Sequence, residues 1–534
     1  MYDLIIKNGK IVDGSGSLAF NGDIAVKDGK IMKISSKINE ATAQVIDATG
    51  LIVSPGFIEC HTHSDYSSFT GSGCTNFLEQ GATTQIAGQC GSSPVPYYEG
   101  GMRAQRQNHT PEEFQRRAAI ALTAKSFIEY ASTQSYGTNM AYFIGHSPIR
   151  AKHVGLTDAK ATAEQIAEMQ QEIKDAMEAG FFGFSTGLVY TPSVYADTEE
   201  IAAIASAMKP YGGVYASHIR GEANTVVDSV AEAIEVGKKA GVHVHVSHIK
   251  VMGKHNEGKS LELIHMIDKA NEQGIPVTAD QYPYTASAAG LESQIPPKYC
   301  IGGTRAMIER IKNRALRKQI DHDIFHNPEE FTSSIYCAGY DGTLVTSATA
   351  TKEYENRTIG EIAKTEGKEP IDVMCDLLIA NNGITSGIYF NQSPNDLIRL
   401  MAHPKVFCGS DSSNVADPRP DEEKVGGRHP RGIGSAVRRL ELTRDLHLRT
   451  LEDAVHSITY APAQVFGLKG QGLLKEGYDA SITIFDYERL HAQATYEHPY
   501  RNNVGVEYVI VNGQIALEHG KITGIRAGKV LKRT

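Results

Sequence analysis

The sequence predicts an α/β protein built on a (β/α)8, TIM-like barrel, with a small β-sandwich domain formed by both ends of the chain. Two observations predict this fold. In the middle of the chain, short apolar runs typical of strands alternate with amphipathic helical patterns, as in βα units around a parallel sheet. At both ends, β-branched segments are separated by Asn-Gly and Asp-Gly turns.

Composition narrows the class of protein. The 534 residues suffice for a large domain with a satellite, and the 41% hydrophobic and 22% charged residues are typical of a globular protein. No apolar run reaches the roughly 18 residues of a membrane span, so we expect no membrane partner. A net charge of -9 without a basic stripe argues against nucleic acid. Seven scattered cysteines argue against a disulfide framework, and Met1 begins no secretory signal, so we expect a cytoplasmic small-molecule enzyme.

The β-sandwich is predicted from residues 1–54 and 465–534. Both parts contain short alternating segments broken at glycine, which is the pattern of hairpins. The clearest of these segments are 2–14, 22–35, 479–486 and 506–524. We therefore expect the two termini to pair with each other while the long middle of the chain forms a separate domain.

The barrel is predicted from residues 55–464. Its eight expected strands are 51–59, Thr83–Gly88, Asn139–His146, Phe181–Thr186, Gly213–His218, Val242–His248, Ile275–Tyr284 and Val406–Asp411. Helices are expected at Thr162–Gly180 and Thr225–Gly241, each ending at a glycine. About 120 residues separate the last two strands, which is too long for a simple crossover, so we expect an insertion around 288–350.

Two histidines follow the first barrel strand in the stretch "PGFIECHTHSD". Residues two apart on a strand face the same side, so His61 and His63 would both point into the barrel at its carboxyl-terminal mouth. Barrel enzymes place their chemistry at this mouth. Other strand ends bring further potential ligands to it, namely Cys90, His218, His248 and Asp411.

Thiolate, imidazole and carboxylate are ligands that zinc prefers, and a catalytic zinc usually takes three protein ligands and a water. The cation can lower the pKa of water from about 15.7 to about 7, and a nearby carboxylate can accept the proton. A single buried His or Cys is more often a packing residue, but candidates at corresponding strand ends favour a metal site. His243 and His245 alternate out of phase with His248, so we expect them to face away from the barrel interior.

Several motifs resemble those of a known family. The "PGFIECHTHSD" stretch, the flanking β segments and the barrel resemble the amidohydrolase superfamily over nearly the whole chain. More narrowly, an ordered set of motifs is similar to the N-acyl-D-amino-acid deacylases (D-aminoacylases). These motifs are "GQCGSSPVP", "GFFGFSTGLVYTPSVYADTEEI", "SHIRGE", "SHIKVMG", "QYPYTAS" and "RHPRGIGSAVRRL". The predicted barrel is thus of the amidohydrolase type.

The resemblance implies a metal centre of a particular kind. Many superfamily members bridge two metals with a carboxylated lysine after strand four, but "FFGFSTGL" contains no lysine. The D-aminoacylase branch uses a cysteine after strand two, and Cys90 occupies that motif. The resemblance implies a tightly bound zinc on Cys90, His218 and His248, with a weaker or empty second site at His61, His63 and Asp411.

The resemblance also implies an activity, the zinc-dependent hydrolysis of N-acyl-D-amino acids to a D-amino acid and a carboxylate. We expect Asp411 to act as general base and then as general acid. Lys250 and Arg431 match family positions that hold the substrate α-carboxylate, and Tyr190 and Tyr282 match positions that assist them. Arg220 and Glu222 follow His218 closely and are candidate supports for that ligand.

Two other functions stay open. A cyclic-amide hydrolase of the hydantoinase or dihydropyrimidinase kind, or an isoaspartyl dipeptide hydrolase, would need similar metal chemistry, although the missing lysine and the presence of Cys90 count against them. A barrel that has lost catalysis would act as a binding module, but every ligand type is retained. The side-chain and acyl preference, the number of metals and the oligomeric state are not predicted.

Overall fold

The fold is described from a computed structural model, which covers residues 1–331, 333–416 and 420–533. At its centre an eight-stranded parallel sheet has the order β16-β12-β11-β10-β9-β8-β7-β6. These strands are β6 (Phe57–Glu59), β7 (Ala82–Ala87), β8 (Asn139–Gly145), β9 (Gly183–Gly187), β10 (Val214–His218), β11 (His243–Val246), β12 (Val277–Gln281) and β16 (Val406–Cys408). Each lies within or next to a predicted strand, and the predicted barrel is confirmed.

The barrel closes between its first and last strands. The Cys60 backbone N–H lies 3.4 Å from the Cys408 carbonyl oxygen, and the N–H of Asp411 donates to the carbonyl of His61 at 2.9 Å. The N–H of His63 donates to the carbonyl of Ser412 at 2.8 Å. This closure brings the segment after β6 beside the segment after β16, so residues far apart in sequence become neighbours at the mouth.

Helices cover the outside of the barrel, mainly α5 (His146–His153), α6 (Ala163–Ala179), α7 (Thr198–Ser206), α8 (Val226–Ala240), α9 (Ser260–Glu272), α15 (Pro394–Ala402), α16 (Arg431–Asp445), α17 (Leu451–Ile458) and α18 (Tyr460–Phe466). Both predicted helices are confirmed. Thr162 caps α6 with a capping box, and Gly180 (φ 107°) and Gly241 (φ 68°) end α6 and α8. No helix of the described residues is long and apolar enough to cross a membrane.

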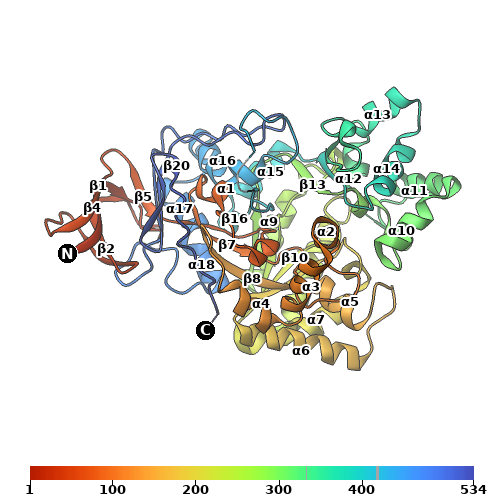
Figure 1. The fold of residues 1–534 in the computed structure, drawn as a ribbon, viewed down its shortest axis with the longest axis horizontal. Helices are drawn as coiled ribbons and strands as arrows, with labels where there is room; N and C mark the ends of the chain where they lie inside the picture. Colours follow the sequence, from red (N-terminus) through yellow and green to blue (C-terminus); the bar gives the residue numbers. More distant parts are fainter. Residues whose placement is uncertain (332, 417–419, 534) are drawn as a thin grey trace.

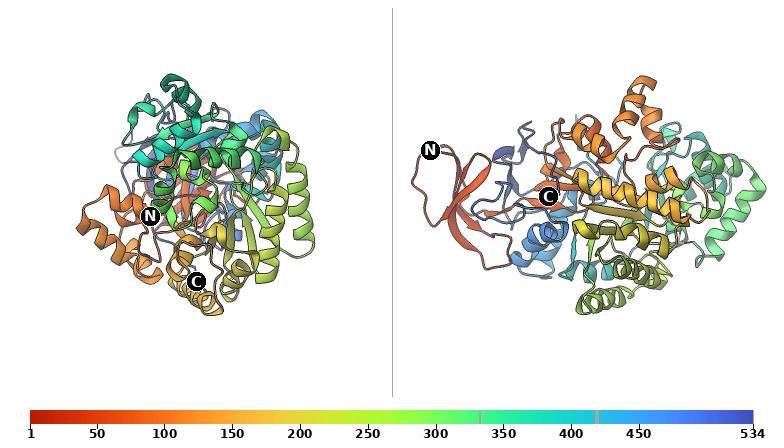
Figure 2. Two further views of the ribbon diagram at one scale, coloured as in Figure 1. Left: turned by 90° about the vertical axis from the view of Figure 1, so that its right-hand side faces the viewer. Right: turned by 90° about the horizontal axis from the view of Figure 1, so that it is seen from below.

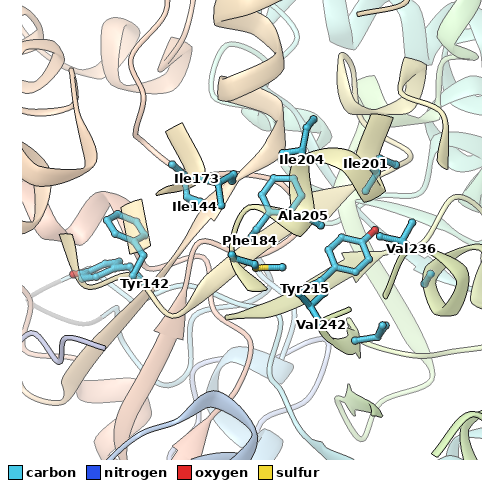
Figure 3. Packing of buried hydrophobic residues seen from close by; sticks show 14 of the residues in the cluster. Tyr142, Ile144, Ile173, Phe184, Ile201, Ile204, Ala205, Tyr215, Val236 and Val242 are labelled. Carbon is cyan, nitrogen blue, oxygen red and sulfur yellow. The ribbon is translucent and has the colours of Figure 1, made fainter. Parts of the chain in front are cut away.

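Apolar side chains seal the helices onto the strands. Figure 3 shows Tyr142, Phe184 and Tyr215 of neighbouring strands packed with Ile173 of α6 and Ile201 of α7. All five are at most 1% exposed. This outer layer is continuous, so it holds the strand ends in fixed positions around the mouth.

The first predicted barrel strand is divided in two. β5 (Ile52–Pro55) pairs with strands of the terminal sheet, whereas β6 belongs to the barrel. Gly56 separates them, and a Cβ there would lie 2.1 Å from Thr83 Oγ1. The chain therefore passes from one sheet to the other at a point where only glycine fits against β7.

Both chain ends build the other large sheet, which has nine strands. They are β1 (Tyr2–Ile11), β2 (Phe20–Lys27), β3 (Lys30–Ser35), β4 (Thr42–Asp47), β5, β17 (Ile482–Phe485), β18 (Val506–Val511), β19 (Gln514–Glu518) and β20 (Lys521–Ile522). The expected pairing of the two termini is confirmed. Residues 528–533, however, leave this sheet and run along the barrel, where the N–H of Leu531 donates to Met140 of β8 at 2.8 Å.

The insertion between β12 and β16 is longer than the range 288–350. Its three-stranded sheet contains β13 (Ala286–Gly290), β14 (Thr343–Ser347) and β15 (Ser386–Phe390), so it extends to Phe390. Its helices are α10 (Gly303–Ile311), α11 (Arg314–His326), α12 (Ser334–Ala338), α13 (Ile359–Glu366) and α14 (Pro370–Ala380). Figures 1 and 2 show the insertion and the terminal sheet at opposite ends of the molecule, with the barrel between them.

Candidate active site

Potential metal ligands gather at the mouth of the barrel in two groups. One group is His61, His63, Cys90 and Asp411, and the other is Cys90, His218 and His248. Within each group the candidate ligand atoms lie within 4.8 Å of one another. Cys90 belongs to both groups, which the sequence did not indicate. Every ligand predicted from the sequence is therefore brought to one place.

The second group is compact and buried. The Cys90 sulfur lies 3.3 Å from His248 Nε2, and that nitrogen lies 2.9 Å from His218 Nδ1. Burial raises the pKa of the Cys90 thiol and lowers the pKa of His218 well below its usual range. Two imidazoles and a thiol that a cation would deprotonate match a three-ligand zinc set with a free position.

The first group is joined to the second through sulfur. His61 Nε2 lies 3.2 Å from the Cys90 sulfur and 3.4 Å from Asp411 Oδ1. His63 Nε2 lies 2.9 Å from the same Asp411 oxygen. The donor set again combines imidazole, carboxylate and thiolate, so it fits a second borderline-soft cation next to the first.

The backbone at three of these residues is unusual. Cys90 (φ 54°), His248 (φ 36°) and Asp411 (φ 49°) all have left-handed conformations. Residues other than glycine rarely adopt this backbone conformation, and residues held in it are concentrated at functional sites. The turn after each strand is thus bent in a way that aims its side chain into the mouth.

Asp411 lies between the imidazoles of its own ligand group and the Arg431 guanidinium. Its Oδ2 lies 2.8 Å from Arg431 Nη1, while Oδ1 faces the two imidazoles of His61 and His63. Burial raises the pKa of this carboxyl, but the Arg431 guanidinium and the neighbouring imidazoles outweigh that effect and hold it well below its usual range. The side chain is therefore an ionised carboxylate within reach of a cation at the mouth.

Glu222 was expected to support His218, but its closer contact is with another ligand, His248, since its Oε2 lies 3.8 Å from His218 Nε2. Its Oε1 lies 3.1 Å from His248 Nδ1 and accepts a hydrogen bond from the Lys250 ammonium. This contact orients the His248 ring so that Nε2 faces Cys90. The same expectation is wrong for Arg220, whose guanidinium instead binds Glu232 (2.8 Å) and backbone carbonyls of the 194–196 segment.

The predicted substrate-binding residues surround the same space. A cavity at the mouth is lined by Tyr190, Lys250, Tyr282 and Asp411, together with the metal ligands His218 and His248. Arg431 stacks on the Tyr282 ring, with Cζ 4.7 Å from its centroid, and the Tyr190 ring lies 5.0 Å from that of His218. Residues of the insertion, such as Ala288 and Ser293, also line this cavity, so the insertion forms part of its wall.

Asp280 is a buried residue of the site that the sequence reasoning missed. Its Oδ2 accepts from His61 Nδ1 at 3.1 Å, and its Oδ1 accepts from the backbone N–H of His248 at 3.0 Å. It thus holds one ligand of each metal group. A carboxylate at Nδ1 places the proton there and leaves His61 Nε2 free to bind a cation. The signal was an acidic residue inside a predicted and fully buried strand.

The expectation that His243 and His245 face away from the interior is wrong. His245 is fully buried, its Nε2 lies 2.9 Å from Asp280 Oδ2, and both imidazoles contact Thr278 Oγ1 at 2.8 and 2.9 Å. The alternation of β11 ends before His248, whose left-handed backbone turns it to the same side. The alternation of side chains along the strand therefore could not predict which of these histidines face the barrel interior.

The chain is similar to known proteins over its whole length. The sequence matches the profile of the amidohydrolase family over residues 44–293 and 330–517. It is 31% identical to a D-aminoacylase of Alcaligenes xylosoxydans xylosoxydans, over 100% of this chain and 98% of that protein. It is 30% identical to an N-acyl-D-glutamate deacylase of the same organism, over 99% of this chain and 96% of that protein.

A solved structure extends the likeness to three dimensions. It is the N-acyl-D-glutamate deacylase of Bordetella bronchiseptica complexed with zinc and a phosphonate inhibitor. The two folds match with a TM-score of 0.82 at 29% identity, over 100% of both chains. The family match and the full-length similarity together identify the chain as a member of the amidohydrolase family.

Proposed function

We propose that the protein is a zinc-dependent enzyme that hydrolyses N-acyl-D-amino acids to a D-amino acid and a carboxylate. The observation that supports this most is the convergence of Cys90, His218 and His248 at the barrel mouth, beside the ionised carboxylate of Asp411. Relatives that carry the names of such deacylases match the chain from end to end.

Zinc is the cation that this donor set fits best, because soft thiolate and imidazole ligands select it over magnesium or calcium. Cys90, His218 and His248 would hold it tightly, and His61, His63 and Asp411 would form a weaker second site that shares Cys90. When bound, zinc polarises an amide carbonyl and lowers the pKa of water.

The chain's own residues orient the substrate. Lys250 and Arg431 supply positive charge for the α-carboxylate, and the Tyr282 ring lies against both cations, 5.9 Å from Lys250 Nζ and 4.7 Å from Arg431 Cζ. A planar guanidinium suits a carboxylate because two parallel N–H groups can bind its two oxygens. Tyr190, next to His218, completes the wall on the other side.

Asp411 moves the proton. As an ionised carboxylate beside the ligands it accepts a proton from the attacking water and then delivers it to the nitrogen of the departing amine. Arg431, at 2.8 Å, keeps the carboxylate aligned during both steps. Asp411→Asn would therefore lose most turnover, while zinc on Cys90, His218 and His248 would be retained.

A substrate panel tests the proposal. Zinc-loaded protein is offered N-acetyl-D-methionine, N-acetyl-L-methionine, an isoaspartyl dipeptide and a hydantoin, and the release of free amine or ring-opened product is measured. We expect hydrolysis of the D-form and none of the L-form. Cleavage of the L-form alone, of the dipeptide alone or of the hydantoin alone would reject the proposed substrate class.

A further inference from the structure

The active-site cavity adjoins a second cavity of about 230 Å³. Val189, Tyr190 and Ser293 line both cavities, so the second begins where the first ends. It lies between the segment around 98–103, the loop after β9 and the start of the insertion. A substrate substituent that passes Tyr190, whose ring lies beside His218, would enter it.

Apolar side chains line one part of the second cavity, beside polar ones such as Thr191 and Thr304. Its hydrocarbon and sulfur side chains are Leu156, Val189, Ile295, Pro297, Cys300 and Met307. Ile295 and Met307 are both 1% exposed and belong to the core of the insertion, so this part of the wall is rigid. Moving hydrocarbon from water into such a space improves binding by about fourfold per methylene.

The charges along both cavities are already paired. In the second cavity Arg103 Nη2 lies 2.8 Å from Glu292 Oε2, which also accepts from Thr304 at 3.0 Å. In the first cavity Lys250 binds Glu222. Among the described residues that line the second cavity, Arg103 is the only Lys or Arg, and Glu292 is its carboxylate partner. A second carboxylate on the substrate would meet Glu292 without an unpaired cation to balance it.

We propose that the second cavity binds an uncharged hydrocarbon substituent of the substrate and that it discriminates against an acidic one. This inference rests on the proposed deacylase function and refines its substrate class. Overall similarity does not decide the point, because the relatives named D-aminoacylase and N-acyl-D-glutamate deacylase are 31% and 30% identical. The substituent is either the amino-acid side chain or a long acyl chain, and the test separates these two sources.

The test compares kcat/KM for five substrates of the zinc-loaded protein. N-acetyl-D-alanine is the reference, because neither of its substituents is long. N-acetyl-D-leucine and N-hexanoyl-D-alanine carry hydrocarbon on the side chain or on the acyl group, and N-acetyl-D-glutamate and N-glutaryl-D-alanine carry an acid there. We expect at least a tenfold gain over the reference for one hydrocarbon substrate and a loss for its acidic counterpart. Faster hydrolysis of either acidic substrate than of both hydrocarbon ones would overturn the proposal.

Two variants locate the effect in the second cavity. Leu156 lines the second cavity but not the active-site cavity. Leu156→Trp fills part of the second cavity and should lower kcat/KM for the favoured hydrocarbon substrate at least tenfold while sparing N-acetyl-D-alanine, whereas Leu156→Met should not. Glu292→Gln frees Arg103 and should raise kcat/KM for the acidic substrates about two- to fivefold. Glu309→Gln, at an exposed position of α10, is the matched control. An unchanged kcat/KM for the acidic substrates in the Glu292 variant, or an equal loss on every substrate in the Leu156→Trp variant, would refute the proposal.

Failure of the inference is distinguishable from failure of the proposed function. If no N-acyl-D-amino acid is hydrolysed, the function is wrong, and calorimetry with the same intact compounds still tests the cavity. Tighter binding of N-acetyl-D-leucine or N-hexanoyl-D-alanine than of their acidic counterparts supports the inference. Equal or tighter binding of the acidic compounds overturns it.

Discussion

Replacing Asp280 with asparagine probes how the two metal groups are held in place. Asp280 is fully buried, and its two oxygens accept from His61 Nδ1, from His245 Nε2 and from the His248 backbone N–H at 2.9–3.1 Å. Asparagine keeps the shape but offers one oxygen and one NH2 group. The asparagine NH2 group would then face at least one of the three N–H groups that now donate to Asp280.

The loss can be estimated from these contacts. A hydrogen bond to a charged group contributes about 1.5–3 kcal/mol, and 1.36 kcal/mol corresponds to a factor of ten. If the new NH2 group faces His61, the proton of that ring moves to Nε2, which then cannot bind a cation. We therefore expect Asp280→Asn to weaken zinc binding at the site containing His61 by about 10–100-fold.

Competition for zinc with a chromogenic chelator measures this change, and thermal unfolding of the metal-free protein shows that the variant folds. Asp396→Asn is the matched control, because Asp396 is equally buried and accepts from Ser260 and Gly258 at the start of α9. Its zinc affinity should equal that of the original protein. The reasoning is refuted if Asp280→Asn binds two zinc ions with unchanged affinity, or if both variants lose affinity equally.

Three further results are expected. Gly409→Ala would bring a Cβ to 2.4 Å from Asp280 Oδ1 and 2.7 Å from His61 Cβ, so we expect a free energy of unfolding lower by about 1–3 kcal/mol and weaker zinc binding; unchanged zinc affinity would contradict this. Phe184→Ala should lower the free energy of unfolding in urea by about 3–5 kcal/mol, and a change below 1 kcal/mol would show that the core of Figure 3 is not tightly packed. Chelation should abolish hydrolysis and added zinc should restore it, whereas full activity of the chelated protein would exclude a zinc enzyme.

Much of the fold follows from local patterns that the sequence displays. The apolar runs, the Thr162 cap of α6 and the glycines that end α6 and α8 predict strands and helices within a few residues. The positions of His61 and His63 at the mouth follow from their two-residue spacing after an apolar strand. The roles of the predicted ligands and substrate-binding residues stay predictions, although the structure brings all of them together.

Features that depend on distant contacts were not predictable. Asp280 meets His61 across 219 residues, and no local pattern announces that pairing. The insertion extends to β15 because β15 pairs with β13 and β14, which is a tertiary contact. His245 was placed on the wrong side because the left-handed backbone of His248 is a tertiary outcome that strand alternation does not contain.

X-ray absorption at the zinc edge of the loaded protein tests the central claim most directly. A zinc held by Cys90, His218 and His248 should show one sulfur at about 2.3 Å and nitrogen or oxygen neighbours at about 2.0–2.1 Å. The sulfur contribution should disappear in Cys90→Ser and persist in Cys74→Ser, because Cys74 lies outside both ligand groups. A spectrum of the original protein without a sulfur neighbour would contradict the account.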